Sequence, residues 1–205
     1  MIEDFLFFEN DWMRKEFSRL EFVQSEKYLT FKAALNIFLQ SQGQLIVETG
    51  TQRMIDDPGG CSTLLFGAFC ARYNRRLITV DNDPKHVEIS KQATMKYAGY
   101  ITYVLQDSVT FLRELNEKID LLYLDSLDCP WPPEDATIAQ THNLNELKAA
   151  YDKLHKDSIL LIDDNNFENG GKTRLSKRFL LEKLLEKGDW QCLLDHGQTL
   201  WIKSS

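Results

Sequence analysis

Acidic residues stand where apolar runs of this chain end, a placement that can build a reactive site. The runs Leu121–Asp125 and Leu160–Asp164 finish in one and two acids, and two further runs finish at Glu48 and Asp81. The carboxyl ends of parallel strands share one edge of a sheet, where open α/β folds bind their ligands. Three acids meeting at that edge repel one another unless a cation or a shared proton intervenes.

A divalent cation is one answer to this repulsion. Hard carboxylate oxygens favour Mg²⁺ or Ca²⁺ over Zn²⁺, and a small octahedral site that keeps its waters favours Mg²⁺. We therefore predict a metal site at Asp125, Asp163 and Asp164. The alternative is that these acids cap loops and meet Lys or Arg. Asp128 can reach the same edge, although its Asp-Cys-Pro context also suits a turn.

A glycine-containing segment, ETGTQRMIDDPGGCST (48–63), follows the first apolar run. Gly50, Gly59 and Gly60 let the backbone approach a ligand closely, and a helix that opens near Cys61-Ser62-Thr63 offers free N–H groups to an anion. The pattern is not GxGxxG, which disfavours a dinucleotide. A turn that merely needs glycine is the alternative interpretation.

Three further polar positions belong to the same predicted edge. A carboxylate at Asp81 can accept two hydrogen bonds from a ribose diol. Asp107-Ser108 follows the third strand, where Asp107 can also be a helix N-cap. His142 precedes a predicted helix on the loop side, where a neutral imidazole can take a proton from an acceptor hydroxyl; a cap or surface residue is the alternative.

Short apolar runs alternate with amphipathic segments from Gln44 onward. We expect strands at 44–49, 76–81, 101–105, 119–125 and 158–163, and helices at 61–74, 84–97, 108–117, 143–156 and 173–187. Residues 190–195 and 198–203 flank a tight His196-Gly197 turn and predict an antiparallel hairpin. Residues 1–40 are expected to be helical, with a 3-4-3 stripe at Tyr28, Phe31, Leu35 and Phe38.

This alternation predicts an α/β fold: a Rossmann-like three-layer sandwich with a mostly parallel seven-stranded sheet and a C-terminal antiparallel hairpin. We expect residues 1–43 to form an N-terminal helical extension and residues 44–205 the main domain. The polar segments 126–142 and 164–172 interrupt the core at the predicted edge, as loops that shape a substrate site often do.

Length and charge restrict the class of protein. The chain has 205 residues, 27% of them charged, and a net charge of -7 with no basic block, which argues against nucleic acid as the main partner. Its four cysteines show no CxxC spacing, as expected for reduced thiols. Glu3 and Asp4 stand where a signal peptide needs positive charge, so we expect a cytoplasmic protein that does not span a membrane.

Over about residues 44–203 the arrangement resembles the class I S-adenosylmethionine-dependent methyltransferases. The resemblance lies in the E-x-G turn at 48–50, the acid at Asp81, the Asp107-Ser108 pair and the terminal hairpin. It implies strand order 3-2-1-4-5-7-6. It also implies that S-adenosylmethionine is bound by Glu48, Thr49, Gly50, Thr51, Gly60, Ser62, Asp81, Asn82, Asp107, Ser108 and Asp125.

Within that superfamily, YLDS (123–126) and IDD (162–164) resemble the metal-dependent macrocin and mycinamicin sugar O-methyltransferases. That resemblance implies magnesium at Asp125, Asp163 and Asp164, beside the acceptor hydroxyls. The catechol-type pattern D…D-N instead selects Asp125, Asp164 and Asn165. Both registers share Asp125 and Asp164.

The sequence therefore predicts a divalent-metal-assisted O-methyltransferase acting on a small-molecule or sugar hydroxyl, with Asp125 and His142 as catalytic residues. Two alternatives remain open: an NAD(P)-binding oxidoreductase on the same scaffold, and a non-catalytic S-adenosylmethionine-binding interaction protein. The partners expected are a small-molecule acceptor and a second copy of the chain in a homodimer. For the homodimer or the acceptor side, the candidate surface is the N-terminal segment with Phe5, Phe7, Phe8 and Trp12.

Overall fold

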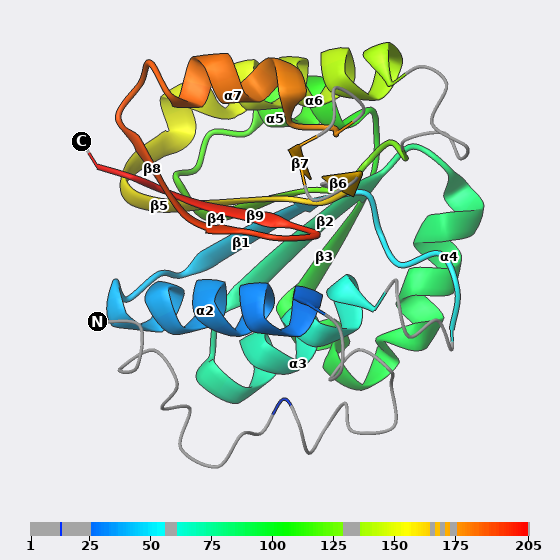
Figure 1. The fold of residues 1–205 in the computed structure, drawn as a ribbon. Helices are drawn as coiled ribbons and strands as arrows, with labels where there is room; N and C mark the ends of the chain where they lie inside the picture. Colours follow the sequence, from blue (N-terminus) through cyan, green and yellow to red (C-terminus); the bar gives the residue numbers. More distant parts are fainter. Residues whose placement is uncertain are drawn as a thin grey trace.

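A seven-stranded sheet forms the middle layer of the protein in the computed structural model (Figure 1). The structure describes residues 13, 26–55, 61–128, 136–164, 167–168, 171–172 and 176–204. The strand order is β3-β2-β1-β4-β5-β9-β8. With the two hairpin strands counted sixth and seventh, this is the predicted order 3-2-1-4-5-7-6, and the predicted fold class is confirmed.

Five parallel strands and the terminal hairpin make up this sheet. The parallel strands are β1 (Leu45–Thr49), β2 (Arg76–Asp81), β3 (Ile101–Leu105), β4 (Ile119–Leu124) and β5 (Leu154–Ile162). The hairpin strands, β8 (Trp190–Asp195) and β9 (Thr199–Lys203), add antiparallel through β9 to β5. Because β1 pairs with β2 on one side and with β4 on the other, the chain reverses its direction of travel across the sheet at β1.

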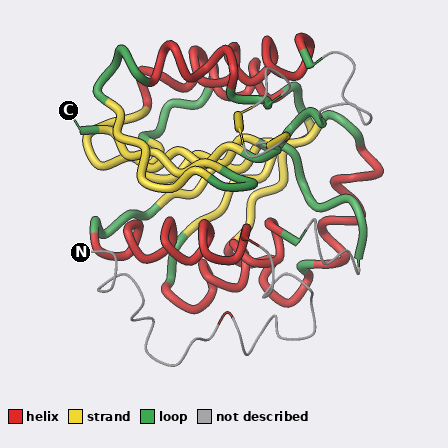
Figure 2. The backbone as a smooth tube through the Cα atoms, in the orientation of Figure 1, coloured by secondary structure: helices red, strands yellow, loops and turns green. Residues whose placement is uncertain are grey.

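Helices cover both faces of the sheet (Figure 2). In Figure 1, α2 (Glu26–Gln40) and α3 (Ser62–Tyr73) lie on one face, while α5 (Ser108–Glu114), α6 (Thr137–Ala150) and α7 (Phe179–Leu185) lie on the other. The helix α4 (Pro84–Ala93) and the 3₁₀ turn η3 (Met95–Tyr100) connect β2 to β3. A separate two-stranded sheet pairs β6 (Phe167–Glu168) with β7 (Gly171–Lys172).

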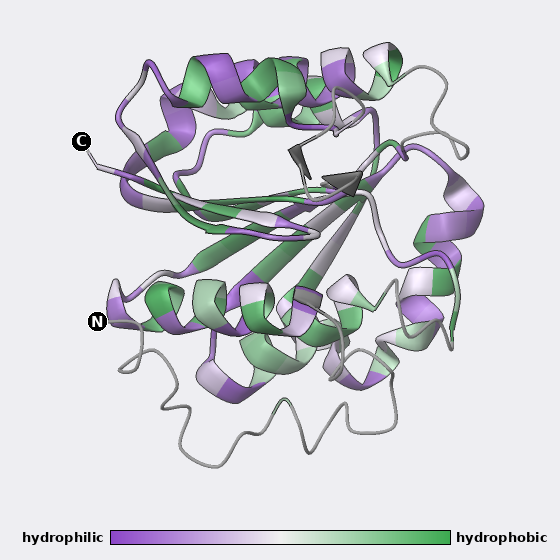
Figure 3. Ribbon diagram, in the orientation of Figure 1, coloured by the Kyte–Doolittle hydropathy of each residue, from purple (hydrophilic) through white to green (hydrophobic). Residues whose placement is uncertain are grey.

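Alternation along the strands supplies both halves of the core. Leu121 and Tyr123 pack with the α2 and α3 side, whereas Leu122 and Leu124 pack with the α5–α7 side, since successive strand side chains point to opposite faces. Figure 3 shows the hydrophobic residues concentrated on the central strands and mixed hydrophobic and hydrophilic positions on the helices. The sheet is therefore buried on both faces, as parallel sheets require.

The predicted stripe on the N-terminal helix is buried as expected. Tyr28, Phe31, Leu35 and Phe38 of α2 are all in the core, and the Phe31 ring packs edge-on against Phe66 and Tyr123, with centroids 5.4 and 5.3 Å away. The predicted helix over residues 1–25, with Phe5, Phe7, Phe8 and Trp12, lies outside the described residues apart from Met13, which is buried in the same core.

Two predicted helices are misplaced in the sequence analysis. The helix predicted at 143–156 is α6 at Thr137–Ala150, followed by the 3₁₀ turn η4 (Tyr151–Lys153). Leu154 completes an apolar helical spacing, but it starts β5, where it is buried against the same core cluster as Leu147. The helix predicted at 173–187 is shorter: β7 ends at Lys172 and α7 spans Phe179–Leu185. No helix in the described part of the chain is both long and apolar enough to cross a membrane.

Candidate active site

Two adjoining cavities open at the carboxyl ends of β1, β2, β3 and β4. Both are lined by Gly50, Asp81, Asn82, Ser126 and Leu127, and their volumes are about 270 and 380 Å³. Both reach the turn after β1, the strand at which the strand order reverses. This is the position where open α/β sheets place their ligands.

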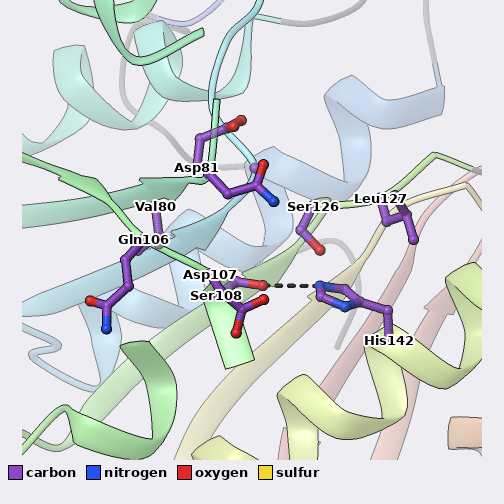
Figure 4. Close-up of a pocket in the computed structure, with 10 residues that line it drawn as sticks. Val80, Asp81, Gln106, Asp107, Ser108, Ser126, Leu127 and His142 are labelled. Atoms are coloured by element: carbon purple, nitrogen blue, oxygen red, sulfur yellow. Dashed lines mark hydrogen bonds between the residues drawn. The ribbon is translucent and has the colours of Figure 1, made fainter. Parts of the chain in front are cut away.

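The first cavity continues from the end of β2 to the end of β3. Its additional lining residues are Val80, Gln106, Asp107, Ser108 and His142 (Figure 4). Asp107 caps α5, because its carboxylate accepts hydrogen bonds from the Thr110 N–H at 2.8 Å and the Thr110 hydroxyl at 2.7 Å. These hydrogen bonds lower the pKa of Asp107. Both sequence interpretations of Asp107, as cap and as cavity residue, describe its position.

His142 projects from α6 toward Ser108 in this cavity (Figure 4). Its Nε2 lies 3.0 Å from Ser108 Oγ and 3.4 Å from Oε1 of the fully buried Glu146. The hydrogen bond to Glu146 raises the pKa of His142 above 6.5, and burial only partly opposes this. His142 therefore lies with Asp107 and Ser108, and its side chain does not line the cavity that contains Asp125.

The second cavity extends from the β1 turn to the end of β4. Thr51, Arg53, Met54, Ser62 and His86 line it, together with the acids Asp83, Asp125 and Asp128. Arg53 and Asp128 form a two-point ion pair, with Nη1–Oδ2 at 2.5 Å and Nη2–Oδ1 at 2.9 Å, and both side chains are about half exposed. Sequence analysis gave Arg53 no role. Gly60 lies outside the described residues.

Gly50 makes the close approach of the two loops feasible. Its φ is +79°, a left-handed value that favours glycine, and a Cβ there would lie 2.3 Å from the Asp125 carbonyl oxygen. The turn is held to the neighbouring strand because the Thr51 N–H donates to Asp81 Oδ2 at 3.3 Å. Asp81 Oδ1 accepts from the Asp83 N–H at 2.8 Å. Asp81 therefore organises both loops beside the cavities.

Glu48 and Thr49, two predicted cofactor residues, are buried below the turn and line neither cavity. Glu48 Oε2 accepts hydrogen bonds from the Thr63 and Thr79 hydroxyls, each at 2.7 Å. Burial raises the pKa of Glu48 to about 7, against the opposing effect of hydrogen bonds from Ser62, Thr63 and Thr79. The side chain ties β1 to β2 and to the start of α3.

Replacing Glu48 should remove a pH dependence of stability. The unfolded chain loses the Glu48 proton near the ordinary pKa of 4.5, whereas the folded chain keeps it up to about 7. Between these values the folded state binds more protons, so stability falls as pH rises, by about 3 kcal/mol in total. Glu48→Gln is expected to lose this decline when urea unfolding is measured at about pH 5 and about pH 9. The exposed Glu186→Gln is the control, and an identical decline in both variants would contradict the assignment.

The three acids predicted to bind metal all lie at the carboxyl edge of the sheet, but each is paired with a lysine. Lys177 Nζ lies 3.1 Å from Asp125 Oδ1 and 2.8 Å from Asp164 Oδ2, and the lysine side chain is fully buried. Lys27 of α2 places its Nζ 2.7 Å from Asp163 Oδ2. The described contacts are therefore those of acids that pair with lysines, and not those of metal ligands.

The two adjacent acids diverge because the chain turns between them. Asp163 is buried on the α2 side, where Oδ2 also accepts from the Tyr123 hydroxyl at 2.9 Å. Asp164 has a φ of +50°, in the left-handed region that Asp tolerates, and its carboxylate reaches Lys177. Carboxylate oxygens of Asp125, Asp128 and Asp164 lie within 4.8 Å of one another. Asp125 and Asp164, common to both predicted registers, are thus together; Asn165 lies outside the described residues.

The charges at this edge shift the pKa values of the acids in opposite directions. Burial and repulsion from Asp163 hold the pKa of Asp125 well above its usual 3.8, although Lys177 opposes this. Burial also acts to raise the pKa of Asp163, but the charges of Lys27 and Lys177 outweigh it and hold that pKa below its usual value. Tyr123 stands between the two acids, and its hydroxyl accepts a hydrogen bond from Gln198 Nε2 at 3.0 Å.

Lys27 and Lys177 belong to the site, although neither was predicted as a site residue. Lys177 falls inside the helix predicted at 173–187, and Lys27 falls inside the segment 1–40 that was expected to be helical. A usable signal was the acid excess itself, because buried carboxylates require counter-charges. The adjacent cations Lys177 and Arg178 could have supplied these counter-charges. Both side chains are buried, and Arg178 pairs with Asp195 of β8 at 3.0 Å.

Solved structures with the same fold share little sequence with this chain. A Podospora anserina methyltransferase with SAH bound, PaMTH1, is 15% identical with a TM-score of 0.60, over 86% of this chain and 79% of that one. The N-methyltransferase NodS of Bradyrhizobium japonicum is 15% identical with a TM-score of 0.50, over 96% and 99%. An rRNA methylase of Streptococcus thermophilus is 11% identical with a TM-score of 0.54, over 86% and 97%.

Sequence comparison assigns the family. No curated protein matches the chain. A family described as "Methyltransferase domain" matches residues 47–165, the segment that runs from β1 past the acids after β5 and includes both cavities' lining residues. Since this match spans more than half of the sequence, the protein belongs to that methyltransferase-domain family.

Proposed function

We propose that the protein transfers a methyl group from S-adenosylmethionine to a hydroxyl of a small molecule, such as a sugar. The observation that carries the proposal is Asp81, which ends β2 between two joined cavities inside a methyltransferase-domain match. One cavity suits the nucleoside and the other suits the methionine end and the acceptor. The SAH bound to PaMTH1, a protein of similar fold, supports this choice of cofactor.

In this proposal the nucleoside occupies the first cavity. The Asp81 carboxylate accepts hydrogen bonds from the ribose diol, with Asn82 beside it. Asp107 and Ser108 face the adenine ring, and His142 completes that wall. His142 is thus proposed as a cofactor contact and not as the general base of the sequence hypothesis. The reason is that His142 lines the nucleoside cavity, whereas the acceptor is proposed to lie in the other cavity, with Asp125. The Gly50–Thr51 turn and Ser62 then lie beside the methionine end.

The acceptor hydroxyl is proposed to lie in the second cavity near Asp125. Its oxygen attacks the sulfonium methyl carbon, the carbon–sulfur bond breaks with its electrons going to sulfur, and the hydroxyl proton passes to the Asp125 carboxylate. Burial raises the pKa of Asp125, which makes that carboxylate a stronger base than an exposed one. Most of the rate acceleration then comes from holding the two reactants in line.

The macrocin-type resemblance would place magnesium beside this hydroxyl, and the described side chains do not fit such a centre. Asp125 and Asp164 share the ammonium of a fully buried Lys177, and Oδ2 of Asp163 is taken by Lys27 and Tyr123. One oxygen, Asp163 Oδ1, is buried without a hydrogen-bond partner, but Asp163 is not among the acids whose oxygens converge. No step of the proposed reaction is therefore assigned to a metal.

Asp81→Ala is expected to weaken S-adenosylmethionine binding at least about tenfold, or roughly 1.4 kcal/mol, through loss of charge-assisted hydrogen bonds. Isothermal titration with S-adenosylmethionine and with NAD measures the effect. Asp152→Ala, an exposed acid on η4, is the matched control and should bind like the wild type. Unchanged affinity in Asp81→Ala would remove Asp81 from the site, and tighter binding of NAD than of S-adenosylmethionine by the wild type would reject the proposed function.

A further inference from the structure

The carboxyl edge of the sheet carries its own cations. Among the described residues, three cations make four ion pairs beside the end of β4: Lys27 with Asp163, Lys177 with Asp125 and Asp164, and Arg53 with Asp128. Counted as ionised, four carboxylates face three cations, which leaves one negative charge. S-adenosylmethionine carries a sulfonium, an ammonium and a carboxylate, and so one net positive charge. One positive charge in the cofactor would offset the one negative charge that these four acids and three cations leave, without a further ion.

Lys177 contacts the acids that would otherwise suit a metal. Carboxylate oxygens of Asp125, Asp128 and Asp164 converge within 4.8 Å of one another, as the ligands of one divalent ion do. Lys177 Nζ lies at 3.1 and 2.8 Å from the first and last of these acids. An ammonium at that position makes two of the contacts that the ion would make and repels the ion itself.

The backbone around Lys177 is fixed from several sides, so the lysine is held at this position. Gln140 of α6 donates to the Ser176 carbonyl at 3.0 Å, and the Lys177 N–H approaches the Asp164 carbonyl at 3.4 Å. The next residue, Arg178, is buried and bonds Asp195 of the terminal hairpin. Withdrawal of Lys177 to admit an ion would disturb contacts with α6, β8 and the end of β5.

We infer that Lys177 takes the place of a divalent metal at this edge and that the acceptor end of the site works without Mg²⁺ or Ca²⁺. Lys177 is a positioning residue: its ammonium holds the Asp125 and Asp164 carboxylates where an ion would hold them. The inference rests on the proposed function only for the statement that this edge is the acceptor end. Its physical content, a lysine-filled cation position, stands on the contacts alone.

Manganese binding tests the inference without any assay of activity. Mn²⁺ is added to the full chain and its uptake is followed by electron paramagnetic resonance, in which the signal of the free ion is lost on binding. The wild type should take up none at this edge. Lys177→Ala should gain one Mn²⁺ site per chain, with affinity at least about tenfold above the wild type. Adding Asp164→Asn to that variant should abolish the gain, and Lys156→Ala, an exposed lysine near the start of β5, should not produce it.

Two results would overturn the inference. One is Mn²⁺ uptake by the wild type that Asp125→Asn removes, because the native edge would then be a metal site. The other is a folded Lys177→Ala variant that gains no site. If Lys177→Ala does not fold, Mn²⁺ uptake by the wild type and by Asp125→Asn still decides whether the native edge is a metal site. Titration of the same samples with S-adenosylmethionine tests the proposed function separately. If S-adenosylmethionine does not bind, the proposed cofactor is rejected, and the manganese result still stands.

Discussion

Gly50→Ala is expected to destabilise the protein by about 3–5 kcal/mol and to abolish cofactor binding. A methyl group at this position meets three backbone atoms: the Asp125 carbonyl oxygen at 2.3 Å, its carbon at 2.8 Å and Ser126 Cα at 2.9 Å. Backbone cannot move aside as the end of a side chain can. The left-handed φ of +79° adds strain for any residue with a Cβ. Denaturant unfolding and titration with S-adenosylmethionine measure the two effects.

Gly99→Ala is the matched control for this substitution. A Cβ at Gly99 has no neighbour within 4 Å, and that glycine lies in η3, away from both cavities. It should unfold within about 0.5 kcal/mol of the wild type and bind the cofactor normally. Equal stability of the two variants would mean that the loops after β1 and β4 are not in contact as described.

Lys177→Met is expected to cost about 3–5 kcal/mol of stability, because it leaves Asp125 and Asp164 beside each other without their shared cation. Although burial alone would lower the pKa of Lys177, the charges of Asp125, Asp164 and Asp163 raise it, so the lysine is an ammonium throughout the working range of pH. Urea unfolding at neutral pH measures the loss. The exposed Lys156→Met should lie within about 0.5 kcal/mol of the wild type.

A double-mutant cycle separates the ion pair from the packing of the lysine stem. Asp164→Asn removes one of the two charges that Lys177 faces, so combining it with Lys177→Met should cost less than the sum of the single losses, by about 0.5–3 kcal/mol. Strict additivity, or a loss below about 1 kcal/mol for Lys177→Met, would show that solvent screens the pair as it screens surface ion pairs.

The strands were predictable because they depend on local pattern, whereas their order came from the resemblance to the methyltransferase family. The apolar runs ending at Thr49, Asp81 and Leu124 have the lengths and composition of buried parallel strands, and the terminal hairpin carries its own turn signal. The convergence of Asp125 and Asp164 follows from the same argument, since parallel strands end at one edge. The predicted strand positions and this convergence required no knowledge of contacts between distant segments.

The counter-charges were not predictable because they depend on tertiary contacts. Lys27 reaches Asp163 from a helix 136 residues earlier in the chain, and Lys177 reaches Asp125 from a turn after β7. Neither pair has a local sequence pattern. Glu48 was predicted as a ligand contact from its place in an E-x-G turn. In the structure it is buried, lines neither cavity and accepts hydrogen bonds from the Thr63 and Thr79 hydroxyls, so it links β1, β2 and α3.

The order of the strands constrains how the chain can fold during synthesis. β1 is made early and can pair with β2 once residue 81 has been made, but its other edge is completed only by β4, which starts at Ile119. Until then β1 exposes an unpaired row of N–H and C=O groups, a template for pairing with other chains. The ion pair between Lys27 and Asp163 forms later still, after β5 has been made. The nascent protein must therefore protect a central strand edge while about half of its residues are still missing, the stage at which slow-forming parallel sheets aggregate most readily.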